Sequence, residues 1–167
     1  MSSFLPSKQT WIAGLGGTPK GFSVVKTYED EYNGNSDLGD LFMVESHVRN
    51  IYHAGVMCSD VEIIQFTQIK SQPVAKASGF SWLFGLSSST TSPPHSESST
   101  SCTGLVSKVN VDGFTQGMSF AIYRKDGGIP ASFEKNVKNA MQKNKKYDFK
   151  TYNCIHFAME LLEVEYE

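Results

Sequence analysis

Three short apolar stretches follow one another between Gly39 and Gln68, and they restrict the fold more than any other feature of the chain. They are GDLFMVES (39–46), IYHAGVMCS (51–59) and VEIIQFTQ (61–68), and turn-forming residues bound each of them. Stretches of this length and composition are typical of β-strands, and Ser59 and Asp60 suit a tight turn between the last two. We therefore expect an antiparallel sheet to begin in this part of the chain.

The remainder of the chain adds strands and then changes to a helical period. GLVSKVNVDGF (104–114) and MSFAIYR (118–124) predict two further strands. Pro130 and Ser132 then open a helix, and a second helix follows the link KYDFKTY (146–152). The apolar faces expected for these helices are Phe133, Val137, Ala140 and Met141 in the first and Cys154, Phe157, Ala158, Leu161 and Leu162 in the second. Strands followed by helices predict an α+β domain with an antiparallel sheet packed on one side by helices.

A serine-rich segment interrupts this pattern. Twelve of the seventeen residues from Ser87 to Thr103 are Ser or Thr, so this segment (87–103) has little apolar surface to bury and is expected to be a mobile loop. GFSWLFGL (79–86) precedes it, and three interpretations of this stretch stay open: contact with a membrane interface, a cover over the core, or a lid over a pocket. The residues that would make the contact are Phe80, Trp82, Leu83, Phe84 and Leu86.

Composition excludes several classes of protein. The chain has 167 residues, the size of one domain, and a formal net charge of −2, which argues against a nucleic-acid partner. KNVKNAMQKNKK (135–146) is a local basic exception. The glycine-rich AGLGGTPKG (13–21) is interpreted as a plain loop, since no amphipathic helix follows it. Three irregularly spaced cysteines, an N-terminal stretch without a secretory pattern and the lack of any apolar run of about 18 residues favour a cytoplasmic protein with free thiols.

Cys154 is the candidate nucleophile. Asn153 is a good N-cap, which places Cys154 in the first turn of the last helix. The helix dipole there favours an anion, and it can lower the pKa of a thiol below its ordinary value of about 8.5. The backbone N–H at this position could also bind an oxyanion. The alternative, that Cys154 is a small buried apolar residue like many free cysteines, stays open, and Cys58 and Cys102 are interpreted as structural.

A thiol nucleophile needs a base, and His53 is the best candidate among four histidines. His53 stands in a predicted strand, and Gln65 across the hairpin could hold one ring nitrogen and direct the other at Cys154. His47 is interpreted as a turn residue, His95 lies in the serine-rich segment, and His156 should diverge from Cys154 on the helix. A histidine in such a strand can equally be a hydrogen-bonded core residue. No CxxC or HxxxH pair occurs, so we expect no metal and no cofactor.

Four elements in this order resemble the lecithin retinol acyltransferase-like family, and the HRAS-like suppressor phospholipases and acyltransferases in particular. They are GDL (39–41), HAGV (53–56), a polar residue twelve positions after the histidine, and NCIHF (153–157). The resemblance implies a single domain over residues 1–167 with a circularly permuted papain-like fold. It also implies a thiol-dependent acyl hydrolase or acyltransferase that acts on lipid acyl esters, with phospholipid as acyl donor, through an acyl-cysteine intermediate. Cys154 matches the nucleophile, His53 the base and Gln65 the third catalytic position.

The chain departs from this family at two positions. Gln65 stands where a second histidine is usual, and Ile155 stands where a glutamate is usual. A neutral amide can orient an imidazole, but it stabilises the imidazolium less than a charged group would. Two alternatives therefore stay open: a thiol isopeptidase of the related PPPDE-type group, acting on SUMO or ubiquitin conjugates, and a catalytically weakened binding module on the same fold.

Overall fold

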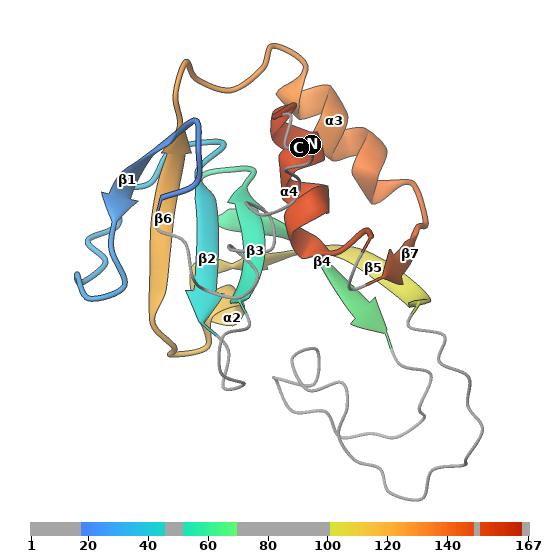
Figure 1. Ribbon diagram of the computed structural model, residues 1–167, viewed down its shortest axis with the longest axis horizontal. Coiled ribbons are helices and arrows are strands. Elements are labelled where there is room, and N and C mark those ends of the chain that lie inside the picture. The colour runs from blue at the N-terminus through green and yellow to red at the C-terminus, as the bar shows by residue number, and fades with distance from the viewer. Residues whose placement is uncertain (1–17, 46–51, 70–100, 149–150, 165–167) are drawn as a thin grey trace, which may run out of the picture.

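The strands form one antiparallel sheet. The computed structural model describes residues 18–45, 52–69, 101–148 and 151–164 (Figure 1). Seven strands lie in the order β1-β6-β2-β3-β4-β5-β7, and every neighbouring pair is antiparallel. Their bounds are β1 (Phe22–Lys26), β2 (Leu41–Glu45), β3 (Tyr52–Met57), β4 (Glu62–Ile69), β5 (Ser101–Asn110), β6 (Phe120–Lys125) and β7 (Lys146–Asp148). Together with three helices in the described residues, this sheet confirms the predicted α+β class.

The predicted central strands are confirmed, and β5 differs from its prediction at both ends. β5 starts at Ser101, because Ser101 pairs with Asp148 of β7 and Thr103 pairs with both Lys146 of β7 and Ile69 of β4. The last three residues of the serine-rich segment, Cys102 among them, are therefore in a strand and not in a loop. Backbone pairing does not require apolar side chains, so composition alone could not reveal this extension. Residues 79–86 and 87–100 lie outside the described residues.

The other end of β5 is set by a helix cap. β5 ends at Asn110, and the short helix α2 (Val111–Thr115) follows where the prediction continued the strand to 114. The Asn110 side chain accepts a hydrogen bond from the Gly113 N–H at 2.6 Å, and this caps the new helix. An asparagine at this position offers the backbone a helical start in place of continued sheet pairing.

Helices α3 (Phe133–Met141) and α4 (Cys154–Leu162) cover one face of the sheet (Figure 1). All five predicted apolar positions of α4 are buried, whereas in α3 only Phe133 and Val137 are fully buried and Met141 is 43% exposed. These helices pack on alternate strand residues, as the pleat requires. The strand residues in this core are Leu41, Met43, Ala54, Val56, Ile64, Phe66, Ala121 and Tyr123.

The opposite face has a second, smaller core under α2. Phe114 of α2 is buried there, and Gly55 of β3 leaves room for its ring. A Cβ at Gly55 would lie 2.6 Å from a carbon of Phe114, closer than side-chain carbons can pack. The prediction of helices on one side was therefore incomplete, because α2 covers part of the other side. The buried members of this core are Phe42, Val44, Met57, Ile63, Phe114 and Ile122.

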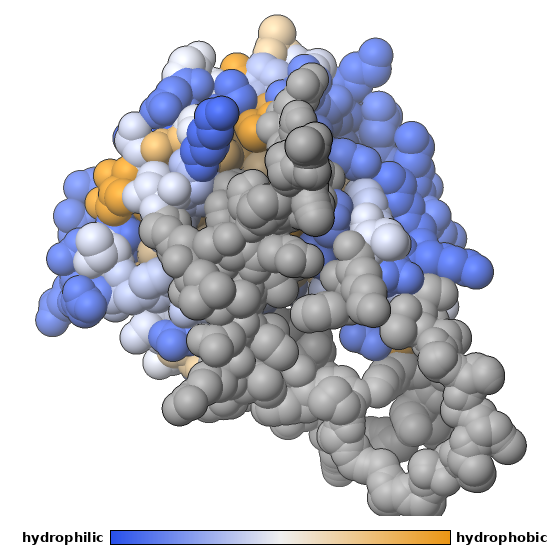
Figure 2. All heavy atoms as spheres, viewed as in Figure 1, coloured by the Kyte–Doolittle hydropathy of each residue, from blue (hydrophilic) through white to orange (hydrophobic). Residues whose placement is uncertain are grey.

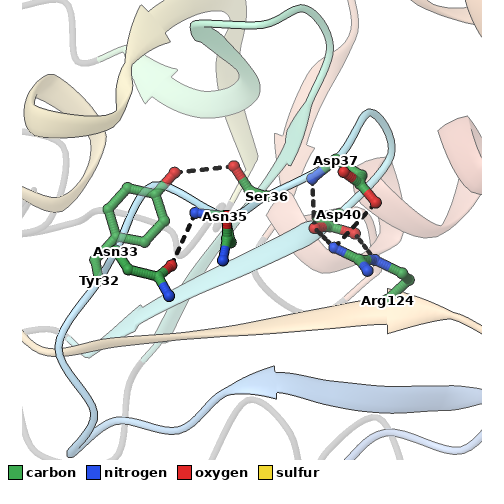
Figure 3. A network of polar contacts seen from close by, with 7 residues as sticks. All are labelled: Tyr32, Asn33, Asn35, Ser36, Asp37, Asp40 and Arg124. Carbon is green, nitrogen blue, oxygen red and sulfur yellow. Dashed lines mark hydrogen bonds and ion pairs between the residues drawn. The ribbon is translucent and has the colours of Figure 1, made fainter.

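The GDL segment begins β2 with an ion pair between a buried carboxylate and a partly exposed guanidinium (Figure 3). Gly39 has φ +88°, a conformation that favours glycine, and its N–H donates to the Met57 carbonyl of β3. Asp40 is buried, and Arg124 of β6 binds both of its oxygens, from Nε at 2.8 Å and from Nη2 at 2.7 Å. The Asp37 N–H donates to the same carboxylate at 2.8 Å. This hydrogen bonding raises the pKa of Arg124 and joins the start of β2 to β6.

In the described part of the chain, no helix combines the length and the apolar character that a bilayer crossing needs.

Candidate functional site

The predicted cap at the start of α4 is confirmed. The Asn153 side chain accepts hydrogen bonds from the N–H groups of Ile155 at 2.9 Å and His156 at 3.3 Å. His156 Nδ1 in turn accepts from the Asn153 N–H at 3.0 Å, which completes a capping box. Cys154 therefore stands in the first turn of a well-capped helix. His156 is part of that cap, consistent with its expected divergence from the thiol.

The Cys154 thiol is buried among hydrogen-bond donors. Hydrogen bonds to the backbone N–H groups of Ala54, Cys154 and Ile155, and one to the Tyr147 side chain, favour the thiolate. Burial has the larger effect and raises the pKa of Cys154 above its ordinary value. The expectation of a lowered thiol pKa is therefore wrong for this structure. Helix position can be predicted from sequence, but the loss of solvent around the sulfur cannot.

His53 and Gln65 lie together, as predicted. His53 Nε2 and Gln65 Oε1 are 2.9 Å apart, and Gln65 Nε2 donates to Ser107 Oγ of β5 at 3.3 Å. Gly55 pairs directly with Gln65, so His53 and Gln65 meet diagonally across the hairpin. Burial lowers the pKa of His53 to about 4, and the hydrogen bond to Gln65 opposes this shift only in part. The imidazole is therefore neutral at physiological pH.

His53 faces away from α4. Its ring stacks on Phe114 of α2, with the ring centroids 5.1 Å apart and an interplanar angle of 26°. The next residue, Ala54, packs in the core that contains Cys154. Successive strand residues point to opposite faces of a sheet, so the imidazole and the thiol lie on opposite faces here. The alignment of a His53 ring nitrogen with Cys154 stays a prediction, which this placement of the two side chains does not favour, although the sulfur lies near the N–H of the residue directly after His53.

A cavity lies between α3 and α4, on the α4 face of the sheet, and Cys154 is not among its lining residues. Its volume is about 170 Å³, its floor includes Phe66 and Phe157, and Lys143 and Lys145 stand on its rim. Tyr147 stacks on Phe66 with the centroids 5.1 Å apart, and Tyr147 also hydrogen-bonds Cys154. Tyr147 is thus in contact both with the thiol and with Phe66, a residue that lines the cavity.

Two neighbours of the site could not be identified from sequence. Tyr147 falls in what was predicted to be a link between helices, and its place beside Cys154 results from the pairing of β7 with β5. Phe114 was assigned to a strand, whereas α2 brings it onto His53. Within the described residues, no group of three or more His, Cys, Asp or Glu side chains is arranged to hold a metal ion.

Comparison with known proteins finds neither a family model nor a curated protein that matches this chain.

Proposed function

We propose that this chain is a thiol-dependent acyl hydrolase or acyltransferase of the lecithin retinol acyltransferase-like type, with a circularly permuted papain-like arrangement. The observation that carries the proposal is the environment of Cys154. Its sulfur lies at the start of a capped helix, among backbone N–H groups, and beside the strand segment that holds the His53–Gln65 pair. A thiol at a helix start, with a histidine held by an amide nearby, provides the groups that acyl transfer needs.

The reaction would proceed in two steps. Cys154 Sγ attacks the ester carbonyl while His53 accepts the thiol proton, and the backbone N–H of Cys154 donates to the oxyanion. The alcohol leaves with the proton from His53, and an acyl-cysteine remains. Water or an amine then attacks this thioester, and the thiol is restored. For these steps an imidazole nitrogen must come within hydrogen-bond distance of Cys154 Sγ, which requires β3 to move relative to α4, because a rotamer change cannot carry a side chain through the sheet. A neutral imidazole is the form that can accept the proton.

The orientation of His53 also favours a second candidate, a binding module that retains the fold without catalysis. A buried imidazole stacked on Phe114 and bonded to Gln65 is a satisfied core histidine in its own right. In this case the His53–Gln65–Ser107 hydrogen bonds serve the packing of the sheet, and Cys154 is an ordinary buried thiol.

Alkylation of Cys154 separates the two candidates. The rate is measured against pH by mass spectrometry, with Cys58 and Cys102 changed to Ser, in the presence and absence of a short-chain activated ester. Acyl transfer predicts an adduct on Cys154 that forms with the ester, and an alkylation rate that falls at least about tenfold in His53→Ala. His156→Ala is the comparison variant, because it removes another buried histidine, one that bonds to the cap of α4 and not to Gln65. Alkylation that is slow near pH 7 and indifferent to His53, with no acyl adduct, would favour the binding module.

The same Cys154 protein tests the isopeptidase alternative. Ubiquitin and SUMO probes that carry a vinyl sulfone should leave Cys154 unlabelled if the substrate is a lipid ester. Labelling of Cys154 by either probe would assign the site to an isopeptidase.

A further inference from the structure

A lysine-rich surface runs along α3 and into β7, and neither proposed function uses it. Between residues 135 and 146 there are five lysines and no acidic residue. The whole chain has a net charge of −2, so the residues outside this segment together carry −7. The five lysines are Lys135, Lys138, Lys143, Lys145 and Lys146, which we call the α3–β7 basic face.

The charges of this face are available to a partner. All five lysine side chains are exposed, and among the described residues Lys145 is the one of the five that forms an ion pair, with Glu160 at 3.3 Å, while Glu134 lies next to Lys135 in the chain. In the view of Figure 2, hydrophilic residues cover the margin of the molecule where α3 lies. Unpaired like charges on one surface repel one another, so an anionic partner would relieve that repulsion.

Apolar hollows adjoin the basic face on both flanks of α3. The cavity described above lies toward α4 and has Lys143 and Lys145 on its rim. A second hollow of about 430 Å³ lies toward β5, where Lys108 and Lys138 stand beside Val137 and the exposed Met141. Each flank therefore combines two cationic side chains and one carboxylate, Glu160 toward α4 and Glu134 toward β5, with apolar lining residues. A partner suited to both features has negative charge and apolar groups close together.

We infer that the α3–β7 basic face docks on the surface of a bilayer that contains anionic phospholipid. The phosphate and carboxylate groups of such lipids would meet the lysines, and the upper parts of the lipid chains would meet Met141 and the hollows beside α3. Each lysine near an anionic membrane contributes to binding, and a group of four to eight is typical of proteins that recognise such membranes.

A nucleic acid fits this surface less well. Every cation of the face is a lysine, whereas recognition of base edges favours the planar fork of arginine. Recognition of single strands uses exposed aromatic rings on which bases stack, and the exposed apolar side chain between these lysines is a methionine. The hollows would remain empty against a phosphate backbone.

Co-sedimentation with vesicles of ether-linked phospholipids tests this inference. These lipids have no acyl ester, so binding is measured without turnover and its outcome does not depend on the proposed acyl transfer. The wild-type chain is expected to partition at least about tenfold more strongly onto vesicles with about 30% anionic lipid than onto neutral vesicles. Raising the salt from about 0.1 M to about 0.5 M should remove most of this preference, because it shortens the range of the attraction.

Two charge-reversed variants locate the surface. Lys138→Glu with Lys143→Glu should weaken partition onto anionic vesicles at least about tenfold. Lys20→Glu with Lys125→Glu makes the same change in net charge outside the basic face and should retain binding within about twofold. Thermal unfolding confirms that both variants fold. Equal binding to neutral and anionic vesicles, equal losses in the two variants, or tighter binding to duplex DNA than to anionic vesicles would each overturn the inference.

Discussion

The imidazole of His53 is held by neighbours of different chemistry, and together they explain why it is neutral. Gln65 provides one hydrogen bond, Phe114 provides an aromatic surface, and the side chain is 3% exposed. Protonation would give this ring a charge in a place without solvent, and neither Gln65 nor Phe114 carries a negative charge to compensate it. His53 and Gln65, whose contact the sequence predicts, are thus stabilised as a neutral pair.

This environment predicts a specific acid sensitivity. Burial lowers the pKa of His53 to about 4 in the folded chain, against an ordinary value of about 6.5 when unfolded. Between these pH values the unfolded state binds the additional proton, so stability falls as the pH falls. Urea unfolding should show that the wild type loses about 2–3 kcal/mol more than His53→Gln between pH 7 and pH 4.5. Equal losses of stability in the wild type and in His53→Gln would contradict the lowered pKa of His53.

A second prediction at the residue scale concerns Arg124. Arg124→Gln should lower the free energy of unfolding by about 2–3 kcal/mol, because Asp40 is buried and would lose both bonds to the guanidinium. Arg124→Lys keeps the charge but not the two parallel hydrogen bonds, so its free energy of unfolding should lie between those of the wild type and Arg124→Gln. Asp37→Asn is the control, since Asp37 is largely exposed and pairs with Arg124 at 3.3 Å. Urea unfolding should place this control within about 0.5 kcal/mol of the wild type; a control as unstable as Arg124→Gln would refute the assignment to Asp40.

Among the helices, the cap of α4 decides where Cys154 stands. Asn153→Ala removes the acceptor for two N–H groups and should cost about 1–2 kcal/mol in chemical unfolding. Asn153→Asp keeps an acceptor and should restore most of this stability. Asn139→Ala, at an exposed position within α3, is the matched control and should be neutral or slightly stabilising. An Asn153→Ala protein with unchanged stability would mean that the cap contributes little to α4.

Elements differ in how far the sequence predicts them, and the reasons are physical. β2, β3 and β4 are short apolar runs that are buried almost throughout, and α4 has an apolar face at helical spacing, so all four were predicted from composition and spacing alone. β1 and β7 are edge strands, and β1 alternates little because its middle residues are exposed. Such edge strands form because a neighbouring strand provides backbone hydrogen-bond partners, and the pattern of a single sequence does not show which segments will be paired in this way.

At the scale of the whole molecule, the candidate site was predictable in its parts and not in its assembly. The cap on Asn153 and the contact between His53 and Gln65 depend on short-range geometry, and both were predicted. Which face of the sheet receives α4 depends on how distant elements pack. The sequence pattern does not predict that α4 packs on Ala54 while α2 packs on His53. A shift of one residue along the strand exchanges which side chains point to each face of the sheet. The residue pattern therefore cannot decide which face α4 covers.

The two cores share one sheet, and this predicts that the domain unfolds as a unit. Phe114→Ala empties part of the α2 core, and Phe157→Ala empties part of the α4 core, where Phe157 stacks on Phe66. Each should cost about 3–5 kcal/mol, because both rings are buried. Strands β2 to β4 contribute residues to both cores, so neither face can unfold while the other remains packed. Circular dichroism and amide hydrogen exchange should therefore report one coincident urea transition in each variant; a Phe114→Ala protein whose α4 face melts separately would show that the two cores are independent.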